Sequence, residues 1–104
     1  MEPLSDVVRE RINGLRSLVG NTPLLELRTV VPGRGSRILL KLESHNPTGS
    51  MKDRMALAMI EAAESDGRLV TGGLVVEYTG GSTGVSLSLV CTVKGYPLHI
   101  VSSD

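Results

Sequence analysis

One lysine in this sequence stands where covalent chemistry with an aldehyde is favoured. Lys52 lies within residues 46–54, which read Asn-Pro-Thr-Gly-Ser-Met-Lys-Asp-Arg. Ser50 is a good N-cap, and Asp53 three residues later suggests a variant of the capping box, so a helix should begin at about Met51. The unpaired N–H groups and the dipole of a first helical turn disfavour an ammonium there and make the free amine more available. A neutral amine is what Schiff-base formation requires.

The same segment has a simpler interpretation. Lys52 can be a surface lysine beside an ordinary N-cap, with Asp53 and Arg54 as solvated charges. It is not a Walker A loop, because an aspartate follows the lysine and the glycine spacing is wrong. The residues alone leave the catalytic and the surface interpretations open.

A second candidate is the loop Thr79-Gly80-Gly81-Ser82-Thr83-Gly84, between a predicted strand and a predicted helix. Successive N–H groups in such a loop can form an anion-binding nest at a helix start. The hydroxyls of Thr79, Ser82 and Thr83 add donors, so a small carboxylate or phosphate is the natural ligand. The alternative is a tight turn that needs glycine only for its backbone angles.

Strand-like and helix-like segments alternate around these loops. They predict an α/β fold of three layers, built from βαβ units with a mainly parallel sheet. The apolar run at 38–42 is typical of a strand buried on both faces, and Asn13-Gly14 should end the first helix. Both loops then follow the carboxyl ends of strands, where ligands usually bind. Strands are expected at 24–27, 38–42, 74–78 and 98–101, helices at 5–13, 51–66 and 82–94, and a loop at 31–36.

Composition narrows the class of protein. The 104 residues carry 11 basic and 11 acidic side chains and only two aromatic ones, so neither a nucleic-acid partner nor a membrane partner is supported. The single cysteine, Cys91, excludes an internal disulfide and a zinc cluster, and it is expected to be a small core residue. No secretory signal is present at the start. We therefore expect a cytoplasmic protein. The last strand has little sequence after it, so we also expect an unfinished α/β layer, as in a fragment.

Taken together, these segments resemble the fold-type II pyridoxal-phosphate (PLP) enzymes, in particular the cysteine synthase and cystathionine β-synthase group. Gly20-Asn21-Thr22-Pro23-Leu24 is similar to the amino-terminal signature of that family. Residues 41–43 and 46–54 match its lysine loop closely, and residues 77–84 stand where it has its substrate-carboxylate loop. The match runs from about Leu18 onward.

The resemblance implies a role for each loop. Lys52 would form the Schiff base with PLP and later move the Cα proton of the substrate. Residues Thr79, Gly80, Gly81, Ser82 and Thr83 would grip the carboxylate of an amino-acid substrate. The family commonly has an asparagine that hydrogen-bonds the ring oxygen of the cofactor where this chain has Ser82, so a shorter hydroxyl would make that contact.

The resemblance also implies that the chain is the amino-terminal portion of a longer enzyme, a homodimer when complete. Residues 1–17 would be an amino-terminal helix and arm, 18–78 the lysine-loop region, and 79–104 the start of the substrate-loop subdomain. The expected reaction is β-replacement on an activated serine, with O-acetylserine and sulfide giving cysteine. The alternatives are β-elimination, as in serine or threonine dehydratases, and a non-catalytic interaction fragment. Family members grip the PLP phosphate with later sequence, so the chain alone should bind PLP weakly and turn over little.

Overall fold

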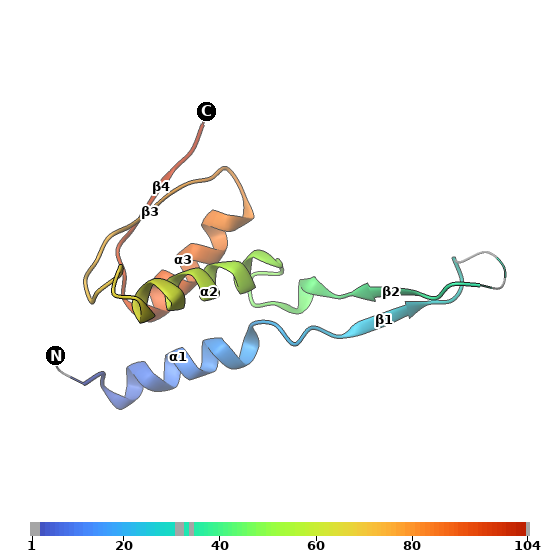
Figure 1. Cartoon of the computed structure of the whole chain (residues 1–104), viewed down its shortest axis with the longest axis horizontal. Coiled ribbons are helices and arrows are strands. Elements are labelled where there is room, and N and C mark those ends of the chain that lie inside the picture. The colour runs from blue at the N-terminus through green and yellow to red at the C-terminus, as the bar shows by residue number, and fades with distance from the viewer. Residues whose placement is uncertain (1–2, 31–32, 34, 104) are drawn as a thin grey trace.

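Three helices and two pairs of strands make up the structure, a computed structural model that describes residues 3–30, 33 and 35–103 (Figure 1). The predicted α/β class is confirmed. Part of the predicted loop at 31–36 lies outside the described residues. The elements in chain order are α1 (Asp6–Leu18), β1 (Leu24–Leu27), β2 (Ile38–Lys41), the 3₁₀ turn η1 (Glu43–His45), α2 (Lys52–Ser65), β3 (Val75–Tyr78), α3 (Ser82–Lys94) and β4 (Leu98–Val101).

The carboxyl-terminal half contains the predicted parallel βαβ unit. Strands β3 and β4 pair in parallel from Val75↔Leu98 to Tyr78↔Val101, and α3 connects them. Helix α3 ends at Gly95, whose φ of 83° is left-handed and whose N–H donates to the carbonyl of Cys91 at 2.8 Å. Glycine tolerates this conformation without steric cost, which explains why the predicted end of the helix is confirmed.

The core lies where the three helices meet. Its fully enclosed members come from α1, α2 and α3, while Val75 and Leu98 pack against it from the sheet. Helix α3 contacts α1, α2 and both strands of the parallel pair, so it lies between layers, as its apolar residues on several sides predict. The buried cluster consists of Leu15, Ala56, Ile60, Leu87, Val90 and Cys91.

Helix α1 is longer than predicted. Ser5 caps it as expected, with its hydroxyl accepting from the N–H of Val8 at 3.3 Å, but the helix continues through Gly14 to Leu18. Ile12 and Leu15 are 7% and 5% exposed, so one helical face is buried on both sides of Gly14. Burial of that face outweighs the low helix propensity of Asn13-Gly14, and the predicted end was therefore wrong.

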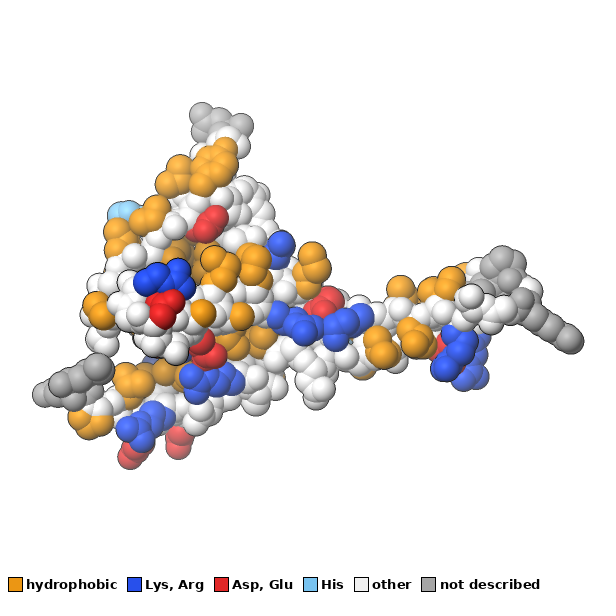
Figure 2. All heavy atoms as spheres, in the orientation of Figure 1, with side chains coloured by type: hydrophobic (Ala, Val, Ile, Leu, Met, Phe, Trp, Pro, Cys, Tyr) orange, Lys and Arg blue, Asp and Glu red, His pale blue; other side chains and the backbone are white. Residues whose placement is uncertain are grey.

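Residues 38–41 form the predicted strand, but the prediction that this strand is buried on both faces was wrong. Strand β2 pairs antiparallel with β1, and the resulting hairpin projects from the helices (Figure 1). All four residues of β2 are exposed, and hydrophobic side chains line the projecting hairpin (Figure 2). A compact domain of this length would have a radius of gyration of about 13 Å, whereas this chain has 17.4 Å. The apolar run is thus a surface that the described residues do not cover.

The parallel pair is covered on one face only. Val75 and Leu98 face the core, whereas Val76, Tyr78 and Val101 are 57%, 67% and 50% exposed. An α/β sheet normally carries helices on both faces. The described residues therefore form an incomplete α/β layer, as the sequence predicts.

Candidate functional site

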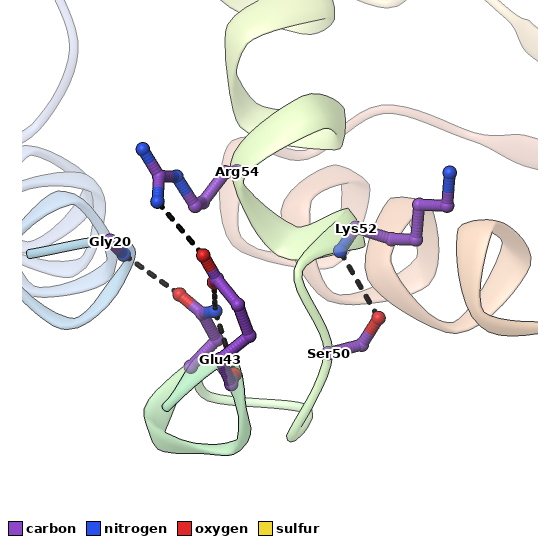
Figure 3. Close-up of polar contacts among 6 residues, drawn as sticks. Gly20, Glu43, Ser50, Lys52 and Arg54 are labelled. Atoms are coloured by element: carbon purple, nitrogen blue, oxygen red, sulfur yellow. Dashed lines mark hydrogen bonds and ion pairs between the residues drawn. The ribbon is translucent and has the colours of Figure 1, made fainter. Parts of the chain in front are cut away.

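Lys52 is the first residue of α2, within one residue of the predicted helix start. Its backbone N–H donates to the hydroxyl of Ser50 at 3.1 Å, but the cap position itself is Met51, one residue after the predicted Ser50. The side chain is half-buried and points away from the ion pair between Glu43 and Arg54 (Figure 3). Among the residues that the structure describes, no acidic group pairs with its ammonium nitrogen. The amine is therefore accessible to a ligand.

The capping-box variant predicted for Asp53 was wrong. Its carboxylate does not return to the backbone of Ser50 but accepts hydrogen bonds from Thr48, at the start of the loop, and from Ser86 of α3. Asp53 is 0% exposed, which also rules out the interpretation of Asp53 as a solvated charge. Arg54 remains largely exposed and pairs with Glu43 at 3.0 Å.

Asn46 joins the lysine loop to the segment that precedes the hairpin. Its side-chain oxygen accepts from the N–H of Gly20 at 2.8 Å, and its amide nitrogen donates to the carbonyl and the carboxylate of Glu43 at 2.8 and 2.7 Å. The side chain is nearly inaccessible, with the residue 4% exposed. Figure 3 shows this network on the opposite side of the loop from the side chain of Lys52. Asn46 therefore fixes the path of the chain toward Lys52.

The second predicted loop turns directly from β3 into α3. The hydroxyl of Thr79 accepts from the N–H of Gly81 at 3.2 Å, and Gly84 N–H donates back to the carbonyl of Gly81 at 3.1 Å. Ser82 is the first residue of α3 and is exposed. The N–H groups of a first helical turn have no acceptor within the helix, so Ser82 and Thr83 offer donors to an anion.

A hollow of about 370 Å³ lies beside this loop. Thr79, Gly80 and Gly81 line one side of it, and Ile100 and Ser102 belong to its wall. Its volume is within the range of small-molecule sites. Lys52 does not line the hollow, so the described residues do not enclose both predicted loops in a single cavity.

Helices α2 and α3 nevertheless start at the same end of the molecule. Asp53, in the first turn of α2, bonds Ser86, one turn into α3, at 2.6 Å. At the opposite ends Lys94 pairs with Glu64 at 2.7 Å. The two helices therefore run side by side in the same direction, as Figure 1 also shows. Their positive dipole ends act together near Lys52 and Ser82, which favours an anionic ligand at this end.

In the part of the chain that the structure describes, the side chains of Cys91 and His45 make no hydrogen bond to either predicted loop. Cys91 is 1% exposed within the core cluster, as predicted, and burial raises the pKa of its thiol. His45 is exposed on η1. Across residues 3–30, 33 and 35–103 no group of histidine, cysteine and acidic side chains could hold a metal ion. None of the helices in that part of the chain is long and apolar enough to cross a membrane.

These residues fit one part of a PLP molecule. The free amine of Lys52 suits the aldehyde, and the start of α3 supplies N–H and hydroxyl donors for a carboxylate or a ring oxygen. The predicted site residues thus lie at one end of the helix pair. Sequence reasoning missed Asn46 and the buried role of Asp53. The only signal for them was a polar residue before Pro47 and a carboxylate next to the lysine.

The fold and these two loops define a PLP-type α/β site, and comparison with known proteins confirms the class. The family model described as "Pyridoxal-phosphate dependent enzyme" matches residues 15–104, and the chain belongs to this family. Cysteine synthase B of Salmonella typhimurium is 43% identical over 93 residues, which are 89% of this chain and 31% of that protein. Cysteine synthase 1 of Emericella nidulans is 51% identical over 89 residues, 86% of this chain and 24% of that protein.

A solved structure extends the comparison to the fold. The crystal structure of a hydrogen sulfide-producing enzyme from Fusobacterium nucleatum superposes with a TM-score of 0.78 at 40% identity, covering 100% of this chain and 32% of that one. The predicted resemblance to cysteine synthases is thereby confirmed. The chain spans less than a third of the length of each of these three relatives.

Proposed function

We propose that this chain is the amino-terminal portion of a PLP-dependent enzyme that catalyses β-replacement on an activated serine. In the cysteine synthase form of the reaction, O-acetylserine and sulfide give cysteine and acetate. One observation carries the proposal. Lys52 begins α2 at the end of the molecule where α3 also begins, in a chain that is 43% identical to a cysteine synthase over 93 residues.

Each predicted residue then has a distinct task. Lys52 would hold the cofactor aldehyde through its amine and, once free, would remove and return the proton at the substrate Cα. Ser82 would donate to the cofactor ring oxygen, and the segment 79–83 would bind the substrate carboxylate through N–H groups and hydroxyls. PLP, when bound, supplies the electron sink for the charge that forms at Cα.

The proposal includes an organisation for the whole enzyme. Residues 1–17 form the amino-terminal helix and arm, 18–78 the lysine-loop region and 79–104 the start of the substrate-loop subdomain. The rest of the enzyme would cover the exposed hairpin and the open face of the parallel pair, and would supply the phosphate-binding loop. A cytoplasmic homodimer is proposed for the complete enzyme. This chain alone should bind PLP weakly, because most of the cofactor contacts come from elsewhere.

A second reaction is supported by a specific similarity. The structure from Fusobacterium nucleatum is that of a hydrogen sulfide-producing enzyme, and it covers the whole of this chain. When the substrate is cysteine, β-elimination by the same lysine chemistry releases its sulfur as sulfide and leaves pyruvate and ammonia. Serine or threonine dehydratases are the corresponding alternative for hydroxyl substrates.

Product analysis distinguishes these reactions. The chain would be joined to the carboxyl-terminal part of a cysteine synthase relative and incubated with PLP, O-acetylserine and sulfide. Cysteine as the main product, lost on substitution Lys52→Ala, supports the proposal. A keto acid in place of cysteine contradicts β-replacement and favours elimination. A matched Arg11→Ala variant, altered at an exposed position of α1, should keep full activity.

A further inference from the structure

The carboxylate next to Lys52 is the most deeply buried charged group near the proposed site. Asp53 is 0% exposed, although it follows a half-buried lysine in the first turn of α2. Within the part of the chain that the structure describes, no lysine or arginine forms an ion pair with it. A buried carboxylate without a cation is costly unless hydrogen bonds satisfy it. The Asp53 carboxylate must therefore be stabilised by hydrogen bonds rather than by a cation.

Three donors satisfy this carboxylate, and they come from two separate parts of the chain. Thr48 donates its N–H to Oδ2 at 2.7 Å and its hydroxyl to Oδ1. Ser86, itself 0% exposed, donates its hydroxyl to Oδ1 at 2.6 Å. The first contacts close the lysine loop onto the helix that follows it. The last contact joins that helix start to α3, one turn below Ser82.

We infer that Asp53 is a positioning residue that holds the Lys52 loop and the start of α3 in one fixed arrangement. The inference rests on the proposed function, since it assigns Asp53 the task of placing Lys52 for attack on the cofactor aldehyde. The hydrogen bonds between Thr48 and Asp53 close the segment that contains Lys52, so they fix the backbone from which the Lys52 side chain extends.

An amide is a poorer partner for these groups than the carboxylate. The backbone N–H of Thr48 can only donate, whereas the hydroxyls of Thr48 and Ser86 can also accept. Asparagine therefore keeps these contacts only if both hydroxyls reverse, and it loses the negative charge that strengthens them. The substitution Asp53→Asn keeps the size of the side chain, so it should weaken the ring without creating a cavity, which makes it more informative than Asp53→Ala.

The test compares lysines within the same chain. PLP is added to the 104-residue chain, borohydride fixes the label, and peptide mass mapping gives the ratio of label on Lys52 to label on the exposed Lys41. Amide hydrogen exchange at Thr48 is measured in parallel. Asp66→Asn is the matched control, because it makes the same change in an exposed residue at the other end of α2. Ser86→Ala is a milder variant that removes only the link to α3.

For Asp53→Asn we expect the Lys52 to Lys41 ratio to fall about tenfold, equivalent to about 1.4 kcal/mol, with faster exchange at Thr48. Ser86→Ala should lower the ratio less, and Asp66→Asn should leave it unchanged. An unchanged ratio in both Asp53→Asn and Ser86→Ala overturns the inference and leaves the proposed function intact. If the unaltered chain shows no preference for Lys52 even when it is joined to the carboxyl-terminal part of a cysteine synthase relative, the proposed function fails. In that case the hydrogen exchange of the Thr48 amide tests the role of Asp53 by itself. If this amide stays protected from exchange in Asp53→Asn, the inference about Asp53 is overturned.

Discussion

Replacing Asn46 by alanine should destabilise the chain more than replacing an exposed asparagine by alanine, because Asn46 makes three hydrogen bonds while almost fully enclosed. Two of these bonds join neutral groups, worth about 0.5–1.5 kcal/mol each, and the third reaches the carboxylate of Glu43, worth about 1.5–3 kcal/mol. Because these contributions overlap and do not add fully, we expect the free energy of unfolding to fall by about 2–4 kcal/mol.

The assay is urea unfolding followed by circular dichroism, with a matched control in the same chain. Asn13 is exposed, and its side chain accepts a single hydrogen bond from Arg16 at 3.4 Å. Asn13→Ala makes the same chemical change and should alter stability by less than about 0.5 kcal/mol. Asn46→Asp should also lower the free energy of unfolding. It keeps the acceptor for the N–H of Gly20, but it loses both donors and places a second carboxylate next to Glu43. If Asn46→Ala and Asn13→Ala cost the same, the reasoning about this network is refuted.

Two further predictions concern helix ends and pH. Gly14→Ala should stabilise the chain by about 0.5–1 kcal/mol, because Gly14 lies inside α1 with open space around it. Gly95→Ala should instead cost about 1–2 kcal/mol, because φ at Gly95 is 83°. Equal effects of the two substitutions on urea unfolding would argue against the longer α1. Burial raises the pKa of the Cys91 thiol above 9.0, and burial followed by the charge of Glu64 raises that of Tyr96 above 10.0. At alkaline pH the folded chain thus keeps protons that the unfolded chain loses, so the free energy of unfolding should fall as pH rises from about 9.0. The fall should be less steep in Cys91→Ala. A free energy of unfolding that stays flat or rises from pH 8 to pH 10.5 would contradict this prediction.

The local signals that predicted α2 and α3 correctly were strong ones. Ser50 before an apolar pattern and the glycine-rich turn at 79–84 placed the two helix starts to within a residue. Gly95 ends α3 through its left-handed backbone, as the glycine after the last apolar turn predicts. The end of α1 was wrong because the same dipeptide logic at Asn13-Gly14 ignores tertiary burial. Ile12 and Leu15 pack into the core on either side of the glycine and keep the helix intact.

The apolar run at 38–42 was misread for a related reason. A continuous apolar segment indicates burial, but it does not show which part of the protein packs against it. In this chain the strand pairs with β1 and remains exposed, so the expected cover lies outside the described residues.

The site was predicted in its reactive residues but not in its supports. Lys52 and the loop at 79–84 stand out by residue type and spacing. The contacts of Asp53 with Thr48 and Ser86 join residues far apart in the sequence, as does the bond from Gly20 to Asn46. Such pairs depend on how α2 packs against α3, which the sequence pattern of either helix does not reveal.

The central claim is that Lys52 is the residue that holds PLP, and the chain has only three lysines with which to test it. Lys41 is exposed on β2, and Lys94 is 3% exposed and paired with Glu64. When the chain is joined to the carboxyl-terminal part of a cysteine synthase relative, PLP should give a visible absorbance band that Lys52→Ala abolishes. After reduction with borohydride, which itself removes that band, peptide mass mapping should find the phosphopyridoxyl group mainly on Lys52. Equal labelling of Lys41 and Lys52, or a band that persists in Lys52→Ala, would contradict the account.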